Sequence, residues 1–155
     1  FKNITGRELK LIFEPGKYLV SESGHFITKV NYIKKSKNNY FAQVNSGFNH
    51  FIRPTLYKSY HEVINLSNPN DPKVEYTVVG YICEKDTFAE KRMISKISKD
   101  DILCFKNAGA YGYNMSSNYN SRLRPAELCI HDDKIKKIRE EENLEDLLNN
   151  QIDIF

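Results

Sequence analysis

The sequence predicts a mainly β fold, a barrel or sandwich of short strands that is followed by one short helix. Two observations predict it. Short apolar segments, several with a period of two, are separated by turns rich in Gly, Pro, Asn and Asp, which is typical of a closed or sandwiched β domain. Near the C-terminal end the period changes, and Leu144, Leu147 and Leu148 share one face of a helix. A length of 155 residues suffices for one such domain with an appendage.

The expected strands follow one another along the chain. The apolar run 11–13 predicts a short buried strand that ends in the turn at residues 14–17. Pro54 interrupts the run 51–57, so a strand there must bend or lie at a sheet edge. The remaining expected strands are residues 26–34, 40–45, 62–66, 75–83 and 102–105, and the hairpin pair 126–131 and 134–139.

The C-terminal tail predicts a capped helix. Asn143 is a good N-cap, and Glu145 and Asp146 place negative charge in the first turn, where the helix dipole favours it. The charged run KIKKIREEE at residues 134–142 is interpreted as the solvated surface of a strand and of the helix start.

Composition argues against several classes of partner. The net charge of +3 is small, so there is little electrostatic reason to expect nucleic acid or an acidic membrane. No apolar run approaches the roughly 20 residues of a membrane span, and nothing resembles a signal peptide. The sparse cysteines and scattered histidines lack metal-site spacing and suit a reducing cytoplasm. Because the chain starts at Phe1 without Met, we expect it to be part of a longer protein.

Residues 107–125, NAGAYGYNMSSNYNSRLRP, predict a functional loop. They show no apolar alternation, and Gly, Asn and Ser make them a poor helix. A loop of this length inside a compact domain is usually functional or disordered, and its three tyrosines argue against disorder. The alternative is a well-packed polar loop without a site.

Three shorter segments carry side chains suited to chemistry. The turn at residues 14–17 follows an expected strand, where backbone N–H groups can bind an anion; a plain turn is the alternative. Arg53, with Tyr57 four residues later, offers a guanidinium fork and a phenol to a carboxylate, or else forms a surface turn. Cys83 and Glu84 close the longest expected strand, where the thiol is either a proton donor or a small buried apolar group.

The order of four segments resembles the C-terminal part of the diaminopimelate decarboxylases. These segments read EPGK, FIRPTLYKSYHEV, VVGYICEKD and DILCFKNAGAYGYNMSSNYNSRLRPAEL, and the resemblance spans residues 13–148. That family consists of pyridoxal-phosphate enzymes of the alanine-racemase-like fold type, with an N-terminal (β/α)8 barrel and a C-terminal β domain. The resemblance implies that residues 1–25 are a remnant of the end of the barrel, including its last strand. It makes residues 26–155 the β domain with its terminal helix.

The resemblance also implies where cofactor and substrate would be held. Backbone N–H groups in the turn of Glu14, Pro15, Gly16 and Lys17 would bind the phosphate of pyridoxal phosphate. Tyr111 would contact both cofactor and substrate. Lys17 would also face a substrate carboxylate, although the family usually has Arg there and Lys lacks the bidentate fork.

Four further residues take roles from the same resemblance. Arg53 and Tyr57 would bind the substrate carboxylate and its polar neighbours, Cys83 would donate a proton, and Glu84 would bind the distal ammonium. Cys83 and Glu84 would reach into the site of a second subunit, which implies a head-to-tail homodimer with shared active sites. The related ornithine decarboxylases usually carry Cys-Asp here, so Cys-Glu favours diaminopimelate.

The implied activity is decarboxylation of meso-2,6-diaminopimelate to L-lysine with release of CO2, in lysine biosynthesis. No lysine of this chain lies in the motif that carries the cofactor in the family, so we expect the chain to be inactive alone. Two alternatives stay open: a decarboxylase of ornithine, arginine or another basic amino acid, and a catalytically inactive homologue that serves dimerisation or regulation. A β-barrel that binds single-stranded nucleic acid through its tyrosines is disfavoured by the missing basic groove.

Overall fold

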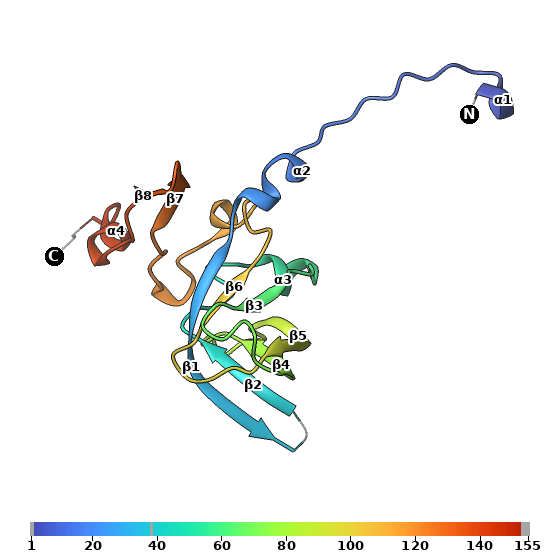
Figure 1. Cartoon of the computed structure of the whole chain (residues 1–155). Helices are drawn as coiled ribbons and strands as arrows, with labels where there is room; N and C mark the ends of the chain where they lie inside the picture. Colours follow the sequence, from blue (N-terminus) through green and yellow to red (C-terminus); the bar gives the residue numbers. More distant parts are fainter. Residues whose placement is uncertain (1, 38, 153–155) are drawn as a thin grey trace.

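The computed structural model describes residues 2–37 and 39–152. Its centre is a six-stranded sheet in the order β3-β6-β1-β2-β4-β5, which curves into a nearly closed barrel (Figure 1). Neighbouring strands are antiparallel, except that β2 and β4 run parallel. The strands are β1 (Phe26–Ser36), β2 (Asn39–Val44), β3 (Val63–Asn65), β4 (Lys73–Val79), β5 (Thr87–Ser95) and β6 (Ile102–Phe105).

The barrel closes where its two edge strands, β3 and β5, approach each other. They stand at opposite ends of the hydrogen-bonded order, and side chains from both line one groove. Asn65 on β3 donates from its side-chain amide to the Lys96 carbonyl, just beyond β5, at 2.9 Å. The mainly β, barrel-like fold predicted from the sequence is confirmed.

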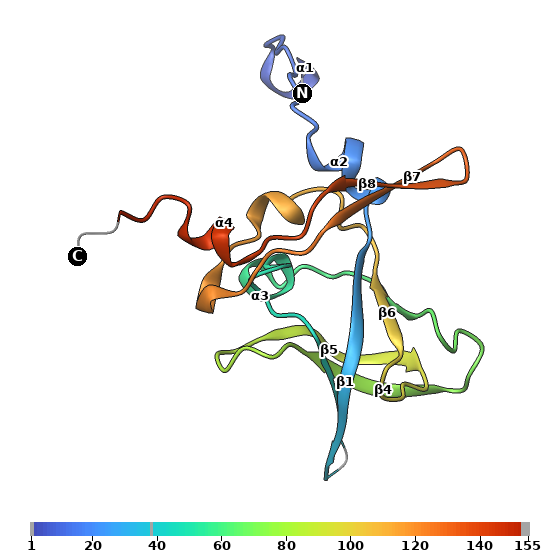
Figure 2. The same cartoon turned by 90° about the vertical axis from the view of Figure 1, so that its left-hand side faces the viewer.

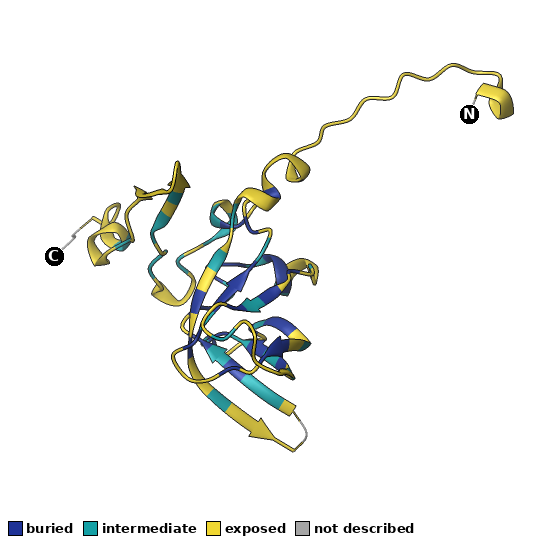
Figure 3. Ribbon diagram, viewed as in Figure 1, coloured by how far each residue is buried: buried dark blue, intermediate teal, exposed yellow. Residues whose placement is uncertain are grey.

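Aromatic rings form the centre of the core. Phe51 and Phe105 are fully buried, and the Phe26 ring packs against both, with ring centroids 5.2 and 5.8 Å apart. Phe88 on β5 packs against Phe105 at 5.3 Å. Burying each such ring stabilises the fold by about 1.5–3 kcal/mol. Figure 3 shows that the buried residues gather in this sheet, which gives the surrounding loops a rigid support.

Most expected strands are confirmed, with two differences on the β4–β5 hairpin. The expectations at 26–34, 40–45, 62–66 and 102–105 correspond to β1, β2, β3 and β6. The expected strand 75–83 is wrong at its C-terminal end, because β4 stops at Val79 and a bend follows. No strand was predicted at β5, since burial does not alternate regularly along it and Lys91 takes a left-handed φ of 48°.

Residues 51–57 form a helix instead of the bent or edge strand that was considered for them. The helix is α3 (Arg53–Tyr57), and Pro54 lies in its first turn. At that position the missing N–H of proline has no helical partner to lose, and its fixed φ favours the helix. Lys58 ends α3 in the left-handed conformation, with a φ of 53°.

The N-terminal part also differs from expectation. It contains α1 (Lys2–Thr5), a coil, α2 (Lys17–Val20) and the 3-10 turn η1 (Ser21–Ser23). The side chains at 11–13 are 73–79% exposed, and this part of the chain runs away from the sheet (Figure 1). The expected buried strand at 11–13 is therefore wrong in this structure, because no described strand pairs with it or covers it.

The C-terminal part matches its expectations. Residues 126–131 and 134–139 form the hairpin β7 (Glu127–His131) and β8 (Lys134–Arg139), and α4 (Leu144–Leu148) follows (Figure 2). Asn143 caps α4: its side chain accepts from the Glu145 and Asp146 backbones, while Asp146 accepts from the Asn143 backbone at 2.8 Å. Across residues 2–37 and 39–152, no helix has the length and apolarity to cross a membrane.

Candidate active site

The loop at residues 107–125 is held at its start by the segment 20–24. The Ala108 backbone N–H donates to the Gly24 carbonyl at 2.8 Å, and the Gly109 N–H donates to the Ser21 carbonyl at 3.0 Å. The two backbones approach so closely that a β-carbon on Gly24 would lie 2.5 Å from the Gly109 α-carbon. Because α2 ends at Val20, this contact sets the end of α2 directly against the start of the loop.

Tyr111 lies at the centre of a first group of predicted site residues. Its backbone is left-handed, with a φ of 59°, a conformation that is uncommon for non-glycine residues. A β-carbon on Gly16 would lie 3.4 Å from the Tyr111 hydroxyl. The guanidinium carbon of Arg53 lies 5.6 Å from the Tyr111 ring centroid and 5.5 Å from that of Tyr57. We call Gly16, Arg53, Tyr57 and Tyr111 the arginine cluster.

Arg53 is poised to bind an anion. It is only 8% exposed, and its Nη2 donates weakly to the Ser59 hydroxyl at 3.4 Å. Its Nε is buried and has no hydrogen-bond partner among the described residues. A buried cation with an unused donor is unfavourable until an anion meets it, and a carboxylate matches the guanidinium fork. The surface-turn interpretation of Arg53 is therefore wrong.

His61 is a neighbour of this cluster that the sequence did not single out. It is buried against Phe51, with ring centroids 4.7 Å apart, and its Nδ1 donates to the Lys106 carbonyl at 2.9 Å. Burial lowers the pKa of His61, and the positive charges of Arg53 and Lys17 lower it further. His61 is therefore neutral at pH 7, and its buried Nε2 has no partner among residues 2–37 and 39–152.

Cys83 and Glu84 belong to a second group, which we call the cysteine cluster together with Tyr119. They lie in the bend after β4, not at a strand end. Cys83 is exposed, so the buried apolar interpretation is wrong, and its thiol donates to the Glu84 carboxylate at 3.4 Å. The Tyr119 hydroxyl donates to the other Glu84 oxygen, and this hydrogen bond lowers the pKa of Glu84. Glu84 is thus an ionised carboxylate beside a thiol.

Asp86 fixes the bend that carries this cluster. Its side chain is buried and accepts from the Phe48 backbone N–H at 2.8 Å and from the Ile82 N–H at 3.0 Å. Its own carbonyl accepts from the Gly80 N–H at 2.9 Å. Burial raises the pKa of Asp86, and the two backbone donors oppose that rise. Asp86 is the last residue of the segment CEKD at positions 83–86, but no role was predicted for it from the sequence.

The predicted site residues therefore fall into two groups that share one loop. Tyr111 near the start of the loop belongs to the arginine cluster, and Tyr119 further along belongs to the cysteine cluster. Glu14 and Pro15 lie in the exposed coil before α2, and Lys17 is the first residue of that helix.

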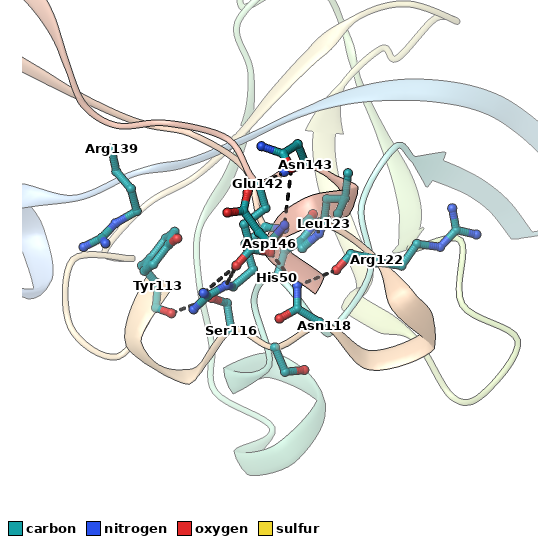
Figure 4. Close-up of polar contacts among 12 residues, drawn as sticks. His50, Tyr113, Ser116, Asn118, Arg122, Leu123, Arg139, Glu142, Asn143 and Asp146 are labelled. Atoms are coloured by element: carbon teal, nitrogen blue, oxygen red, sulfur yellow. Dashed lines mark hydrogen bonds and ion pairs between the residues drawn. The ribbon is translucent and has the colours of Figure 1, made fainter. Parts of the chain in front are cut away.

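The far end of the loop is held by His50 and by the C-terminal tail (Figure 4). His50 donates from Nε2 to the Leu123 carbonyl at 2.9 Å. Glu142 accepts from Arg124 Nε and from Asn118 Nδ2, each at 2.5 Å. Burial would raise the pKa of Glu142, but these hydrogen bonds lower it overall. The interpretation of the acidic run as wholly solvated is thus wrong at Glu142.

A sequence model of the pyridoxal-dependent decarboxylases, describing their C-terminal sheet domain, matches residues 17–109. The chain belongs to this family. The diaminopimelate decarboxylases of Methanothermobacter thermautotrophicus and Campylobacter jejuni are 43% and 44% identical to the chain, each over 91% of its length. The chain spans only 33% and 35% of the length of those two relatives.

A solved structure gives the same result for the fold. The crystal structure of the M. jannaschii diaminopimelate decarboxylase in co-complex with L-lysine matches with a TM-score of 0.84 and 34% identity. The match covers 90% of this chain and 32% of that decarboxylase. The resemblance found in the sequence is confirmed.

Membership of the family implies pyridoxal phosphate as cofactor, and the arginine cluster fits it. At a helix start the first N–H groups have no carbonyl one turn earlier, so those of Lys17 and Tyr18 could donate to a phosphate, whereas the Leu19 N–H already donates to the Gly16 carbonyl at 3.1 Å. Tyr111 places an aromatic ring and a hydroxyl beside that turn. Lys17 and Arg53 add positive charge, which suits a phosphate and a substrate carboxylate.

Proposed function

We propose that the whole protein decarboxylates meso-2,6-diaminopimelate to L-lysine and CO2. The observation that carries this proposal is the pair of Cys83 and the ionised Glu84, a proton donor next to a receptor for an ammonium group. The names of relatives at 43% and 44% identity support the choice of substrate.

The arginine cluster would bind the substrate by its charge. Bound pyridoxal phosphate supplies an electron sink for the carbon that loses CO2. The Arg53 guanidinium would bind a substrate carboxylate through its unused donors, with Tyr57 and Lys17 beside it. Tyr111 would contact the cofactor and the substrate from the loop, with its ring 5.6 Å from the Arg53 guanidinium carbon.

The cysteine cluster would complete the reaction. The Cys83 thiol would give its proton to the carbon that has lost CO2, and Glu84 would bind the distal ammonium of diaminopimelate. We propose that both act in the site of a second subunit, in a head-to-tail homodimer. Among the described residues, no hydrogen bond or ring contact joins the two clusters, and this supports an arrangement in which each cluster serves a different site.

The domain division belongs to the same proposal. Residues 1–25 would complete the (β/α)8 barrel, and residues 26–155 would form the β domain. The lysine that carries the cofactor would lie in the barrel, so the chain would be inactive by itself. The exposed apolar side chains of the N-terminal coil support this division, because such groups are normally covered in a complete protein.

The test is a substrate panel on the whole protein, with Glu84→Ala beside it. We expect turnover of diaminopimelate only, because ornithine and arginine lack the distal carboxylate for Arg53, and a severe loss in Glu84→Ala with cofactor absorbance unchanged. Turnover of ornithine or arginine would indicate the alternative decarboxylase. A protein that binds cofactor but turns over none of these substrates would indicate an inactive homologue.

A further inference from the structure

Two side chains in the described part of the chain donate to the Glu84 carboxylate, and both are neutral; the backbone N–H of Glu84 itself also hydrogen-bonds it. One oxygen accepts from the Tyr119 hydroxyl, and the other accepts from the Cys83 thiol at 3.4 Å. The thiol is a weak donor, whereas a hydroxyl is a strong one. Tyr119 is therefore the contact that decides where the carboxylate points.

Tyr119 is itself held in place from two directions. Its ring packs against Phe48, with centroids 5.3 Å apart, and the Phe48 backbone is fixed by the buried Asp86. Just before it in the loop, the Ser117 N–H donates to the Asn49 carbonyl at 2.8 Å. A phenol supported in this way can hold a side chain that is otherwise free to rotate in solvent.

The choice of a phenol has an electrostatic consequence. A Lys or Arg at this position would orient Glu84 equally well, but its positive charge would neutralise the carboxylate and repel an ammonium ligand. Tyrosine supplies direction without charge. The full negative charge of Glu84 thus stays available, and the hydrogen bond also favours the ionised form.

We propose that Tyr119 is the positioning residue for Glu84, and that it fixes the carboxylate in the orientation that selects a substrate with a distal ammonium. This inference rests on the proposed decarboxylase function. The loop at residues 107–125 would then have two roles: Tyr111 would contact cofactor and substrate, and Tyr119 would position Glu84.

Tyr119→Phe in the whole protein tests the inference, because it removes the hydroxyl and keeps the ring on Phe48. We expect kcat/KM for diaminopimelate to fall about ten- to hundredfold, the usual effect of losing one hydrogen bond to a charged group. In the variant, the acid limb of the pH profile of kcat/KM should move to higher pH, because Glu84 ionises less readily without the Tyr119 hydroxyl. Tyr113→Phe is the matched control, because Tyr113 lies in the same loop and its ring packs against Arg124 and Arg139. Loss of the Tyr113 hydroxyl should leave kcat/KM and the acid limb of the pH profile unchanged.

A double-mutant comparison separates positioning from general support of the fold. If Tyr119 acts through Glu84, Tyr119→Phe will have no further effect in a Glu84→Ala background. A full additional loss in that background, or an unchanged rate and pH profile in the single variant, would overturn the inference.

A second readout does not depend on turnover. The acceptor on Glu84 raises the pKa of Tyr119, so Glu84→Gln should lower it, as followed by NMR of ring-labelled tyrosine in the whole protein. If the wild-type protein fails to turn over diaminopimelate, the proposed function is wrong. The titration then still tests whether Tyr119 donates its hydrogen bond to Glu84. A Tyr119 pKa that ignores Glu84→Gln would overturn the inference in either case.

Discussion

Gly109 faces the Val20 carbonyl so closely that a β-carbon on Gly109 would lie 2.1 Å from that oxygen. The contact is between two backbone segments, so no flexible side chain can move aside. It is the point at which the end of α2 is set against the loop that carries Tyr111. The distance between the turn at residues 14–17 and Tyr111 therefore depends on the absence of a methyl group at Gly109.

Gly109→Ala should separate these two segments. We expect a loss of about 1–3 kcal/mol in the free energy of unfolding, the usual cost of overpacking, and weaker cofactor binding in the whole protein. Urea unfolding and cofactor titration measure the two effects. Gly16→Ala is the control for stability, because its backbone φ of -98° suits any residue and the added carbon would meet its nearest atom, the Tyr111 hydroxyl, at 3.4 Å. An equal loss of stability in the two variants would contradict the prediction.

Glu142→Ala should release the loop from the C-terminal tail. The Glu142 side chain is only 12% exposed and accepts from the Arg124 backbone at 2.7 Å as well as from the Arg124 and Asn118 side chains. Removing it leaves these donors without their acceptor, so we expect a loss of about 2–3 kcal/mol and faster proteolysis of the loop.

Glu141→Ala is the matched control for that change. Glu141 is next in the chain, but it is 63% exposed and pairs with Lys137 at 3.3 Å in solvent. Such exposed pairs contribute about 0–1 kcal/mol, so its removal should hardly change stability. A similar loss in both variants would show that general acidity of the tail matters instead of the Glu142 contacts.

Acidification should destabilise the fold through His50 and His61. Burial lowers the pKa of each histidine below its ordinary 6.5, although a backbone hydrogen bond opposes this in both. For His50, the charge of Arg122 lowers the pKa further and the charge of Glu142 raises it. For His61, Arg53 and Lys17 add to the lowering. Below pH 6.5 the unfolded chain takes up protons that the folded chain excludes, so the stability present above pH 6.5 is lost as pH falls towards the folded pKa values.

Unfolding at several pH values measures this loss. Each histidine adds at most about 1.4 kcal/mol per pH unit to the slope between its unfolded and folded pKa values. His61→Asn removes one titrating group and keeps a donor for the Lys106 carbonyl, so the slope should become smaller. An unchanged slope would mean that His61 does not take part.

Sequence patterns predicted the parts of the fold in which local chemistry and tertiary environment agree. The hairpin of β7 and β8 and the cap at Asn143 depend on neighbours in the chain, so the sequence could reveal them. β5 could not be recognised, because the left-handed Lys91 and the register shifts against β4 break its alternation. Pro54 was ambiguous for a different reason: the same fixed φ that disrupts a strand also starts a helix.

The site was predictable in its residue types but not in its contacts. Arg53, Cys83 and Glu84 were singled out by residue type, but the roles proposed for them and for Tyr111 came from the resemblance, since no local pattern pairs residues so far apart. His61 and Asp86 are buried polar residues whose roles depend on the groups that face them, and burial of that kind is not visible in a single sequence.

One loop touches both clusters, and this limits how the chain can change in length. Moving Tyr111 relative to Tyr119 by one inserted or deleted residue would spoil one cluster or the other, since Gly109 fixes one end and Glu142 holds the other. The segment from Tyr111 to Tyr119 should therefore keep a constant length wherever both clusters are in use.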